Sequence, residues 1–141
     1  MLQVTFKEIA IVPKKRRFRI KQEKSYRVHL QDKSNNILPI YIEEQQAGAI
    51  IRGTDLVPSP KRPLTHDLFA NVLTDWSLDL EKVTISGIND NDIYIASLIF
   101  RQGDTTKEID CRPSDAIALA LRLDCPIFVA ETLMSEKAIA A

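Results

Sequence analysis

Polar and apolar residues alternate along several short stretches of the chain, which is the period of a β-strand with one buried face. This pattern predicts a hairpin of strands 26–30 and 38–42 across the turn DKSNN. The same reasoning predicts further strands over residues 4–12, 18–20, 83–85, 93–100, 107–111 and 126–129. Short turns such as GINDND and RQGDTT separate neighbouring strands, so we expect mixed or antiparallel sheets.

Three other segments have the composition or the spacing of helices. Residues 45–53, QQAGAIIRG, predict a short buried helix that stops at Gly53 in a left-handed conformation. A longer helix starts at Thr65, which suits its N-cap, and apolar residues recur at steps of three and four as far as Trp76. The third helix, residues 113–122, is apolar on several sides and has a proline at its first position.

These elements predict an α+β fold with mixed or antiparallel sheets and three main helices, and they argue against a doubly wound parallel sheet. The two halves of the chain resemble each other at a shift of 68 or 69 residues, where YRVHL at 26–30 matches YIASL at 94–98. We therefore predict an internal duplication of a strand-hairpin-helix unit. Residues 1–133 would form a single domain, and residues 134–141 a short C-terminal tail.

The composition is that of a globular domain with a core, since 45% of the 141 residues are apolar and 27% are charged. No apolar run approaches the ~20 residues that span a bilayer, and the first residues lack the order of a signal peptide. We therefore expect a cytoplasmic protein without a membrane partner. Cys111 and Cys125 form neither a CxxC pair nor a zinc-ligand spacing, so we expect buried free thiols.

The net charge of zero hides a separation of charge along the sequence. Residues 1–27 contain nine Lys or Arg and two Glu, which gives this segment +7 and leaves −7 for the remainder. Its run KKRRFRIK can bind the phosphates of DNA or RNA, through Lys14, Lys15, Arg16, Arg17 and Arg19. The alternative is a solvated hairpin edge, because charges on an edge strand also discourage aggregation.

Residues 108–129, EIDCRPSDAIALALRLDCPIFV, place several polar side chains where the third helix begins. A helix start offers unpaired N–H groups and a partial positive charge, so Arg112 and Ser114 are candidates to hold a phosphate. Asp110 and Asp115 are candidate catalytic carboxylates. The alternative for Ser114 and Asp115 is a purely structural helix-start signal, because hydroxyls and acids are common there.

Residues 61–68, KRPLTHDL, supply a second set of candidates. His66 is a candidate general base beside Asp67, and the planar guanidinium of Arg62 suits a phosphate. Here too a helix start explains part of the pattern, because an acid in the first turn interacts favourably with the helix dipole. A functional site requires that this segment and the previous one meet across one cleft.

LPIYI at 38–42, KRPLTHDL at 61–68 and IDCRPSDAIALAL followed by CPIFV resemble the bifunctional nuclease domain family. The resemblance covers nearly the whole chain, from the first hairpin to Val129. It implies an α+β fold, self-association as a homo-oligomer such as a dimer, and degradation of both DNA and RNA. Two features depart from the family pattern: Gln46 stands where the family tends to have glutamate, and the first hairpin is richer in Lys and Arg. If that glutamate is catalytic, this chain is impaired.

Two functions from different classes fit these residues. The first is a nuclease of broad specificity for DNA or RNA, in which Mg²⁺ or another divalent metal, or a histidine, activates water. Its candidate bases and metal ligands are His66, Asp67, Asp110 and Asp115, and its phosphate-binding residues are Arg62, Arg112 and Ser114. The second is a noncatalytic regulatory module, in which the basic N-terminal hairpin binds nucleic acid or a partner protein.

Overall fold

The structure of the chain, a computed structural model, describes residues 1–14 and 23–140. The strand predicted over residues 18–20 lies outside the described residues, as do Lys15, Arg16, Arg17 and Arg19. The elements in chain order are β1 (Leu2–Lys14), β2 (Glu23–Gln31), β3 (Asn36–Ile42), α1 (Glu44–Ile51), α2 (Thr65–Asp75), β4 (Asp79–Ile88), β5 (Tyr94–Gln102), β6 (Thr105–Cys111), α3 (Pro113–Leu123), β7 (Ile127–Val129), α4 (Glu131–Lys137) and β8 (Ile139–Ala140).

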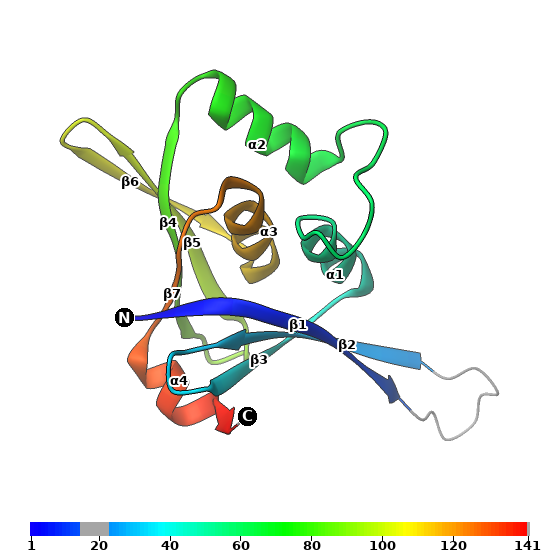
Figure 1. Ribbon diagram of the computed structural model, residues 1–141. Coiled ribbons are helices and arrows are strands. Elements are labelled where there is room, and N and C mark those ends of the chain that lie inside the picture. Colours follow the sequence, from blue (N-terminus) through cyan, green and yellow to red (C-terminus); the bar gives the residue numbers. More distant parts are fainter. Residues whose placement is uncertain (15–22, 141) are drawn as a thin grey trace.

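The eight strands of the described residues form one sheet in the order β6-β5-β4-β7-β1-β2-β3-β8. Neighbouring strands are antiparallel except for β4 and β7, which run parallel. Figure 1 shows that β4, β5 and β6 run across the direction of β1, β2 and β3, with α1, α2 and α3 gathered on one side. The predicted α+β fold with a mixed sheet is therefore confirmed.

Both halves of the chain follow the same order of elements. In the first half β1, β2 and β3 form an antiparallel meander that leads into α1, and in the second half β4, β5 and β6 lead into α3. α2 lies in the connection between the two halves. This repeated order is what a duplicated unit would produce, and the duplication itself stays a prediction.

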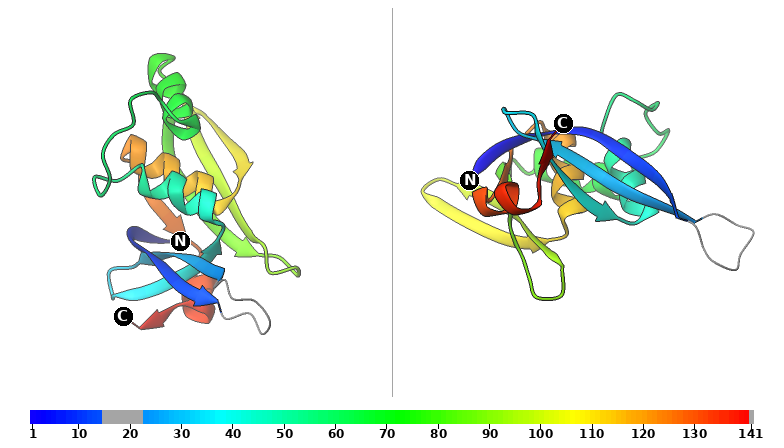
Figure 2. Two further views of the ribbon diagram at one scale, coloured as in Figure 1. Left: turned by 90° about the vertical axis from the view of Figure 1, so that its right-hand side faces the viewer. Right: turned by 90° about the horizontal axis from the view of Figure 1, so that it is seen from below.

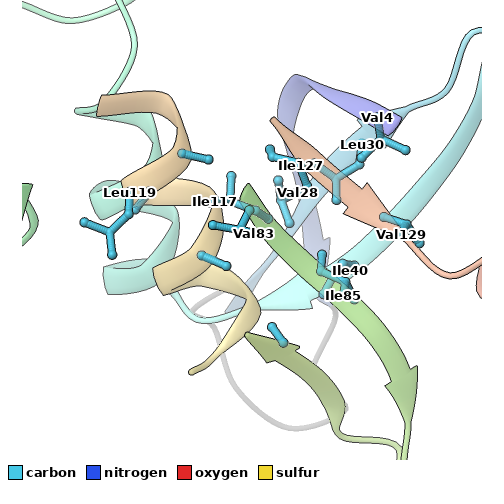
Figure 3. Close-up of a cluster of buried hydrophobic side chains, with 14 of the residues drawn as sticks. Val4, Val28, Leu30, Ile40, Val83, Ile85, Ile117, Leu119, Ile127 and Val129 are labelled. Atoms are coloured by element: carbon cyan, nitrogen blue, oxygen red, sulfur yellow. The ribbon is translucent and has the colours of Figure 1, made fainter. Parts of the chain in front are cut away.

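Helix α3 lies at the centre of the core. Its residues Ala116–Ala120 are at most 2% exposed, and a helix that is apolar on all sides must be covered by other elements. Figure 3 shows Ile117 and Leu119 on α3 in a cluster with apolar side chains of the sheet, among them Val28 and Val83. This packing fixes the position of the residues at the start of α3, where the candidate chemistry lies.

Two details predicted for the helix ends are wrong. Gly53 is not left-handed, because Arg52 ends α1 with helical backbone angles and Gly103 is the one glycine with positive φ among the described residues. A Cβ atom at Gly53 would instead lie 2.8 Å from Nη1 of Arg122, so a side chain there would displace this guanidinium. The N-cap of α2 is Leu64 rather than Thr65, because the N–H of Leu64 donates to Oδ2 of Asp67 at 2.9 Å.

The last residues of the chain add a short helix and a short strand. Leu133 and Met134 of α4 are buried, and Ile139 of β8 pairs with Ile37 of β3. Figure 2 shows α4 apart from the other three helices, on the far side of β1, β2 and β3. Among the described helices, none has the length and apolar character needed to cross a membrane.

Candidate functional site

A cavity of about 520 Å³ lies between α1 and the first turns of α2 and α3. Gln45 and Gln46 of α1 line it, together with Thr65 and His66 of α2. On the side of α3 its wall contains Arg112 and Ser114, and Arg52 and Arg122 complete its basic side chains. Because the start of a helix carries a partial positive charge, these walls suit an anion.

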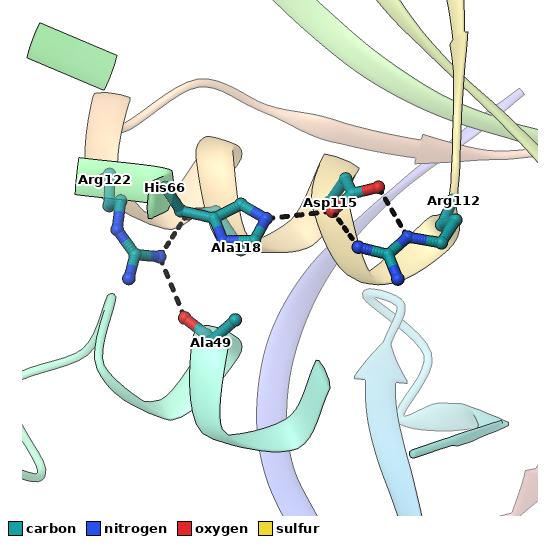
Figure 4. Close-up of polar contacts among 6 residues, drawn as sticks. All are labelled: Ala49, His66, Arg112, Asp115, Ala118 and Arg122. Atoms are coloured by element: carbon teal, nitrogen blue, oxygen red, sulfur yellow. Dashed lines mark hydrogen bonds and ion pairs between the residues drawn. The ribbon is translucent and has the colours of Figure 1, made fainter. Parts of the chain in front are cut away.

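His66 and Arg112 are joined through the carboxylate of Asp115. Nε2 of His66 lies 2.9 Å from Oδ1 of Asp115, and Nε and Nη2 of Arg112 donate to the same carboxylate at 2.8 and 2.9 Å. Figure 4 shows this chain of contacts, with the imidazole reaching from α2 to the first turn of α3. The two predicted segments, 61–68 and 108–129, therefore meet at this cavity.

The charge of Asp115 fixes the proton arrangement of His66. Burial raises the pKa of Asp115, but the hydrogen bonds and charges of Arg112 and His66 outweigh it, and the pKa is lowered overall. An ionised carboxylate can only accept a hydrogen bond, so Nε2 of His66 must be the donor. In the neutral ring Nδ1 then keeps its lone pair, and a nitrogen of this kind can accept a proton from a bound group.

Ser114 is a buried hydroxyl at the wall of the cavity. The residue is 2% exposed, and its Oγ atom has no hydrogen-bond partner among the described residues. A buried hydroxyl without a partner is costly, and a ligand oxygen beside Arg112 would give it one. The expectation that Ser114 serves only to cap α3 has no hydrogen bond to support it.

Asp67 lies beside the cavity in a different network. Its Oδ1 accepts from Nε of Arg122 at 2.6 Å, and its Oδ2 accepts from the N–H of Leu64. Burial raises the pKa of Asp67, whereas the hydrogen bonds from Arg122 and Leu64 lower it and prevail. Both carboxylate oxygens are therefore engaged within the protein.

Arg122 connects the three helices around the cavity. Its side chain is 7% exposed, and besides Asp67 it donates to the carbonyl oxygens of Ala49 and Ala118 at 2.9 and 3.0 Å. Figure 4 shows the last two contacts, of which the one to Ala49 joins α3 to α1 and the one to Ala118 lies within α3. The sequence contains a signal for this residue, because Arg122 is the one basic residue of an apolar helix and a buried charge requires a partner.

The remaining predicted site residues lie elsewhere. Asp110 is exposed on β6, and because side chains alternate along a strand it points away from the face that carries Cys111, which packs on the core. Arg62 is exposed before α2 and does not line the cavity. Lys14 ends β1, and the other four residues of the basic hairpin lie outside the described part of the chain.

Gln46, the residue that departs from the family pattern, has a structural partner. Its Oε1 accepts a hydrogen bond from the N–H of Glu43 at 2.9 Å, which is one half of a capping box at the start of α1. Glutamate and glutamine both serve in this position. The departure at Gln46 therefore leaves the cap of α1 intact.

Comparison with known proteins identifies the family of this chain. The family model described as the bifunctional nuclease domain matches residues 28–141. The chain is also similar to two proteins of Mycobacterium tuberculosis, "Uncharacterized protein MT1877" of strain CDC 1551 / Oshkosh and "Uncharacterized protein Rv1829" of strain ATCC 25618 / H37Rv. Each is 35% identical over 120 residues, which cover 84% of this chain and 70% of the relative. The chain therefore belongs to the bifunctional nuclease domain family.

Proposed function

We propose that this protein is a nuclease that cleaves phosphodiester bonds of DNA or RNA, and that the cavity between α1, α2 and α3 is its active site. The observation that carries the proposal is the contact between His66 and Asp115 at a cavity lined by three helix starts and by arginines. An oriented histidine is a general base, and the arginines and helix starts suit a phosphate. Membership of the family adds a nuclease description to this geometry.

Each group has a definite part in the reaction. Arg112, Arg52 and the hydroxyl of Ser114 hold the phosphate oxygens at the wall of the cavity. Nδ1 of His66 accepts a proton from the attacking water as the new phosphorus–oxygen bond forms and the bond to the leaving sugar oxygen breaks. The carboxylate of Asp115 stabilises the resulting imidazolium of His66. The proton then passes from Nδ1 of this imidazolium to the leaving oxygen or to solvent.

The donor atoms at the cavity do not fit Mg²⁺, which is held by carboxylate and other oxygen ligands. Arginine or histidine nitrogens occupy the oxygens of Asp115, and Asp67 uses both of its oxygens on Arg122 and Leu64. In the described ranges, 1–14 and 23–140, no group of three His, Cys, Asp or Glu side chains is placed to hold a metal. We therefore infer that cleavage proceeds without a divalent metal and persists in EDTA.

The test compares cleavage of single- and double-stranded DNA and RNA by the purified protein and by variants, each with Mg²⁺, Mn²⁺ or EDTA. We expect His66→Ala to lower the rate about 10²- to 10⁴-fold, the contribution of a general base, and Asp115→Asn to lower it less. Asp110→Asn is the matched control, because it removes a carboxylate on β6 outside the cavity. Cleavage that survives His66→Ala, or that falls equally in Asp110→Asn, contradicts the proposed site.

A noncatalytic module is the second candidate, and one pair of side chains next to the basic hairpin favours it. The guanidinium of Arg27 on β2 lies 5.8 Å from the ring centre of Tyr41 on β3, and Tyr41 is exposed. An exposed ring with a cation is a surface on which a base can stack. This function predicts binding without cleavage that weakens steeply with salt and falls when Arg16, Arg17 and Arg19 become alanine.

A further inference from the structure

A second hollow borders α1 next to the cavity of His66. Its volume is about 310 Å³, and β1, β2 and α1 form its walls. Ile9 and Ile11 of β1, Tyr26 of β2 and Ile51 of α1 give these walls an apolar character. Ile11 pairs with Tyr26 across the two strands and is 56% exposed, so the hollow leaves apolar surface in contact with solvent.

Gly48 is the residue of α1 that lines both the hollow and the cavity. On the surface of this helix Glu44 and Ile51 face the hollow, whereas Gln45 and Arg52 face the cavity. With 3.6 residues per turn, Gly48 lies between these two sets. Because it has no side chain, the bare backbone of α1 forms the boundary between the two spaces.

The packing of the described residues does not explain a glycine at position 48. Gly103 is the one glycine with positive φ among them, so Gly48 has backbone angles that any residue adopts. A Cβ atom at Gly48 would have no neighbour within 4 Å in the described part of the chain. A glycine inside a helix is destabilising relative to alanine, and one use of glycine is to let a ligand approach the backbone closely. Gly48 therefore suits a ligand that crosses α1 from the cavity to the hollow.

The walls of the hollow determine which ligand fits. Tyr26 offers an aromatic ring, and the isoleucines offer apolar surface. Glu44 is the one charged side chain among the described residues that line the hollow, and its carboxylate repels an anion. Burial and the charge of Glu44 raise the pKa of the Tyr26 hydroxyl, so this ring is neutral at physiological pH. A flat, neutral ring that carries an amino donor, such as adenine, complements these walls.

We infer that the hollow is a subsite for one unpaired base of a single-stranded nucleic acid, whose neighbouring phosphate lies in the cavity of His66. The inference rests on the proposed nuclease function and specifies the form of its substrate. The sugar of the bound nucleotide crosses α1 at Gly48, and the base stacks on Tyr26. A base inside a duplex is stacked and paired on both sides, so it enters the hollow only after it leaves the duplex.

Binding of a short, fluorescently labelled oligodeoxyadenylate, measured by anisotropy, tests the subsite. It is compared with oligonucleotides of the same length in which one sugar lacks its base, at each position in turn. The protein carries His66→Ala, so that cleavage does not consume the probe. Loss of the base at one position is expected to weaken binding about 5-fold or more, the effect of losing one stacked base.

Substitutions of tyrosine locate the base. Tyr26→Ala is expected to make the complete and the abasic oligonucleotides bind alike, whereas Tyr26→Phe keeps the ring and is expected to keep the difference. Tyr41→Ala is the matched control, because Tyr41 is an exposed ring on the neighbouring strand β3 and lies on the opposite face of the sheet, opposite Arg27. It is expected to leave the difference between the two oligonucleotides unchanged.

Gly48→Leu is a second variant that does not depend on how well Tyr26→Ala folds. A leucine is expected to raise the melting temperature, because it favours a helix more than glycine does and meets open space. It is also expected to abolish the dependence of binding on the base, because its side chain separates the hollow from the cavity.

The results distinguish this inference from the nuclease proposal. Equal binding of complete and abasic oligonucleotides before any change at Tyr26 or Gly48, a base dependence that survives Gly48→Leu, or one that Tyr41→Ala removes and Tyr26→Ala does not would overturn the subsite. Absence of cleavage that depends on His66 contradicts the nuclease proposal, whereas the dependence of binding on the base and on Tyr26 is measured without cleavage.

Discussion

Asp67 pairs with Arg122, and we therefore expect Asp67 to be a structural rather than a catalytic acid. The variant Asp67→Asn tests this expectation. The substitution keeps the size of the side chain and removes its charge. It leaves the guanidinium of Arg122 buried, with the carbonyl oxygens of Ala49 and Ala118 as its remaining partners. We therefore expect a loss of stability with no direct effect on His66, Arg112 or Ser114, the groups that act on the phosphate in the proposed mechanism.

The size of the loss follows from burial. Removing one member of a buried ion pair costs about 3–5 kcal/mol. Two carbonyl acceptors remain for Arg122, and Asp67 is partly exposed, so we expect the lower end of this range, about 3 kcal/mol. For a chain of this length, such a loss lowers the melting temperature by roughly 10 °C.

Urea unfolding followed by circular dichroism measures the free energy of unfolding, and cleavage is assayed well below the melting temperature. Asp104→Asn is the matched control, because Asp104 is exposed in the turn between β5 and β6. The double variant with Arg122→Met is expected to lose less than the sum of the two single changes, since no buried charge then lacks a partner. An Asp67→Asn protein that keeps its stability within about 1 kcal/mol and loses cleavage would refute this reasoning and support the catalytic role predicted from the sequence.

Three further predictions concern the cap of α1, acid and thiols. Gln46→Glu is expected to keep the hydrogen bond from the N–H of Glu43 and to raise the free energy of unfolding by about 0.3–1 kcal/mol. The rate of cleavage is expected to stay the same, and a higher rate would identify a catalytic carboxylate at this position. The lowered pKa of Asp115 means that its ionised form contributes stability above the ordinary value of 3.8, and this contribution is lost as the pH falls through the lowered pKa. Urea unfolding between roughly pH 5 and pH 2 measures this loss, and the free energy of unfolding of Asp115→Asn is expected to fall less steeply with falling pH. Burial raises the pKa of Cys111 to about 12 and that of Cys125 to about 11, so iodoacetamide is expected to label neither at neutral pH until the chain is unfolded, as mass spectrometry can show.

The elements with strong local patterns were predictable from the sequence. Alternation and apolar runs located β1 to β7, and helical spacing located α2 and α3 to within a few residues, whereas the two-residue strand β8 was not predicted. The position of both motifs at helix starts was predictable, whereas the meeting of His66 with Arg112 and Asp115 was only a condition for the predicted site. Their convergence depends on how α2 returns over α3, and the spacing of residues along the chain does not determine this.

Other parts of the site depend on contacts between distant residues. Arg122 donates hydrogen bonds to Asp67, 55 residues away in the sequence, and to Ala49, 73 residues away. Neither pairing therefore leaves a local sequence pattern. Asp110 was predicted as a candidate catalytic carboxylate, but β6 is an edge strand and its residues are largely exposed. Sequence alternation alone does not distinguish an edge strand from a central one, and this distinction decides whether a carboxylate is buried.

The topology of the fold supports the proposal that the cavity binds an anion. α1 and α3 each follow the last strand of an antiparallel meander and pack on each other, and α2 returns its first turn over the same pair. The first turns of all three helices contribute to the wall of the cavity, and Arg52 at the end of α1 and Arg122 in the last turn of α3 add ionised side chains to it. The acids nearby, Asp67 and Asp115, use their oxygens to hold Arg122, Arg112 and His66 in place. On the proposed function, these acids hold the basic side chains in position, and the arginines that line the cavity bind the phosphate.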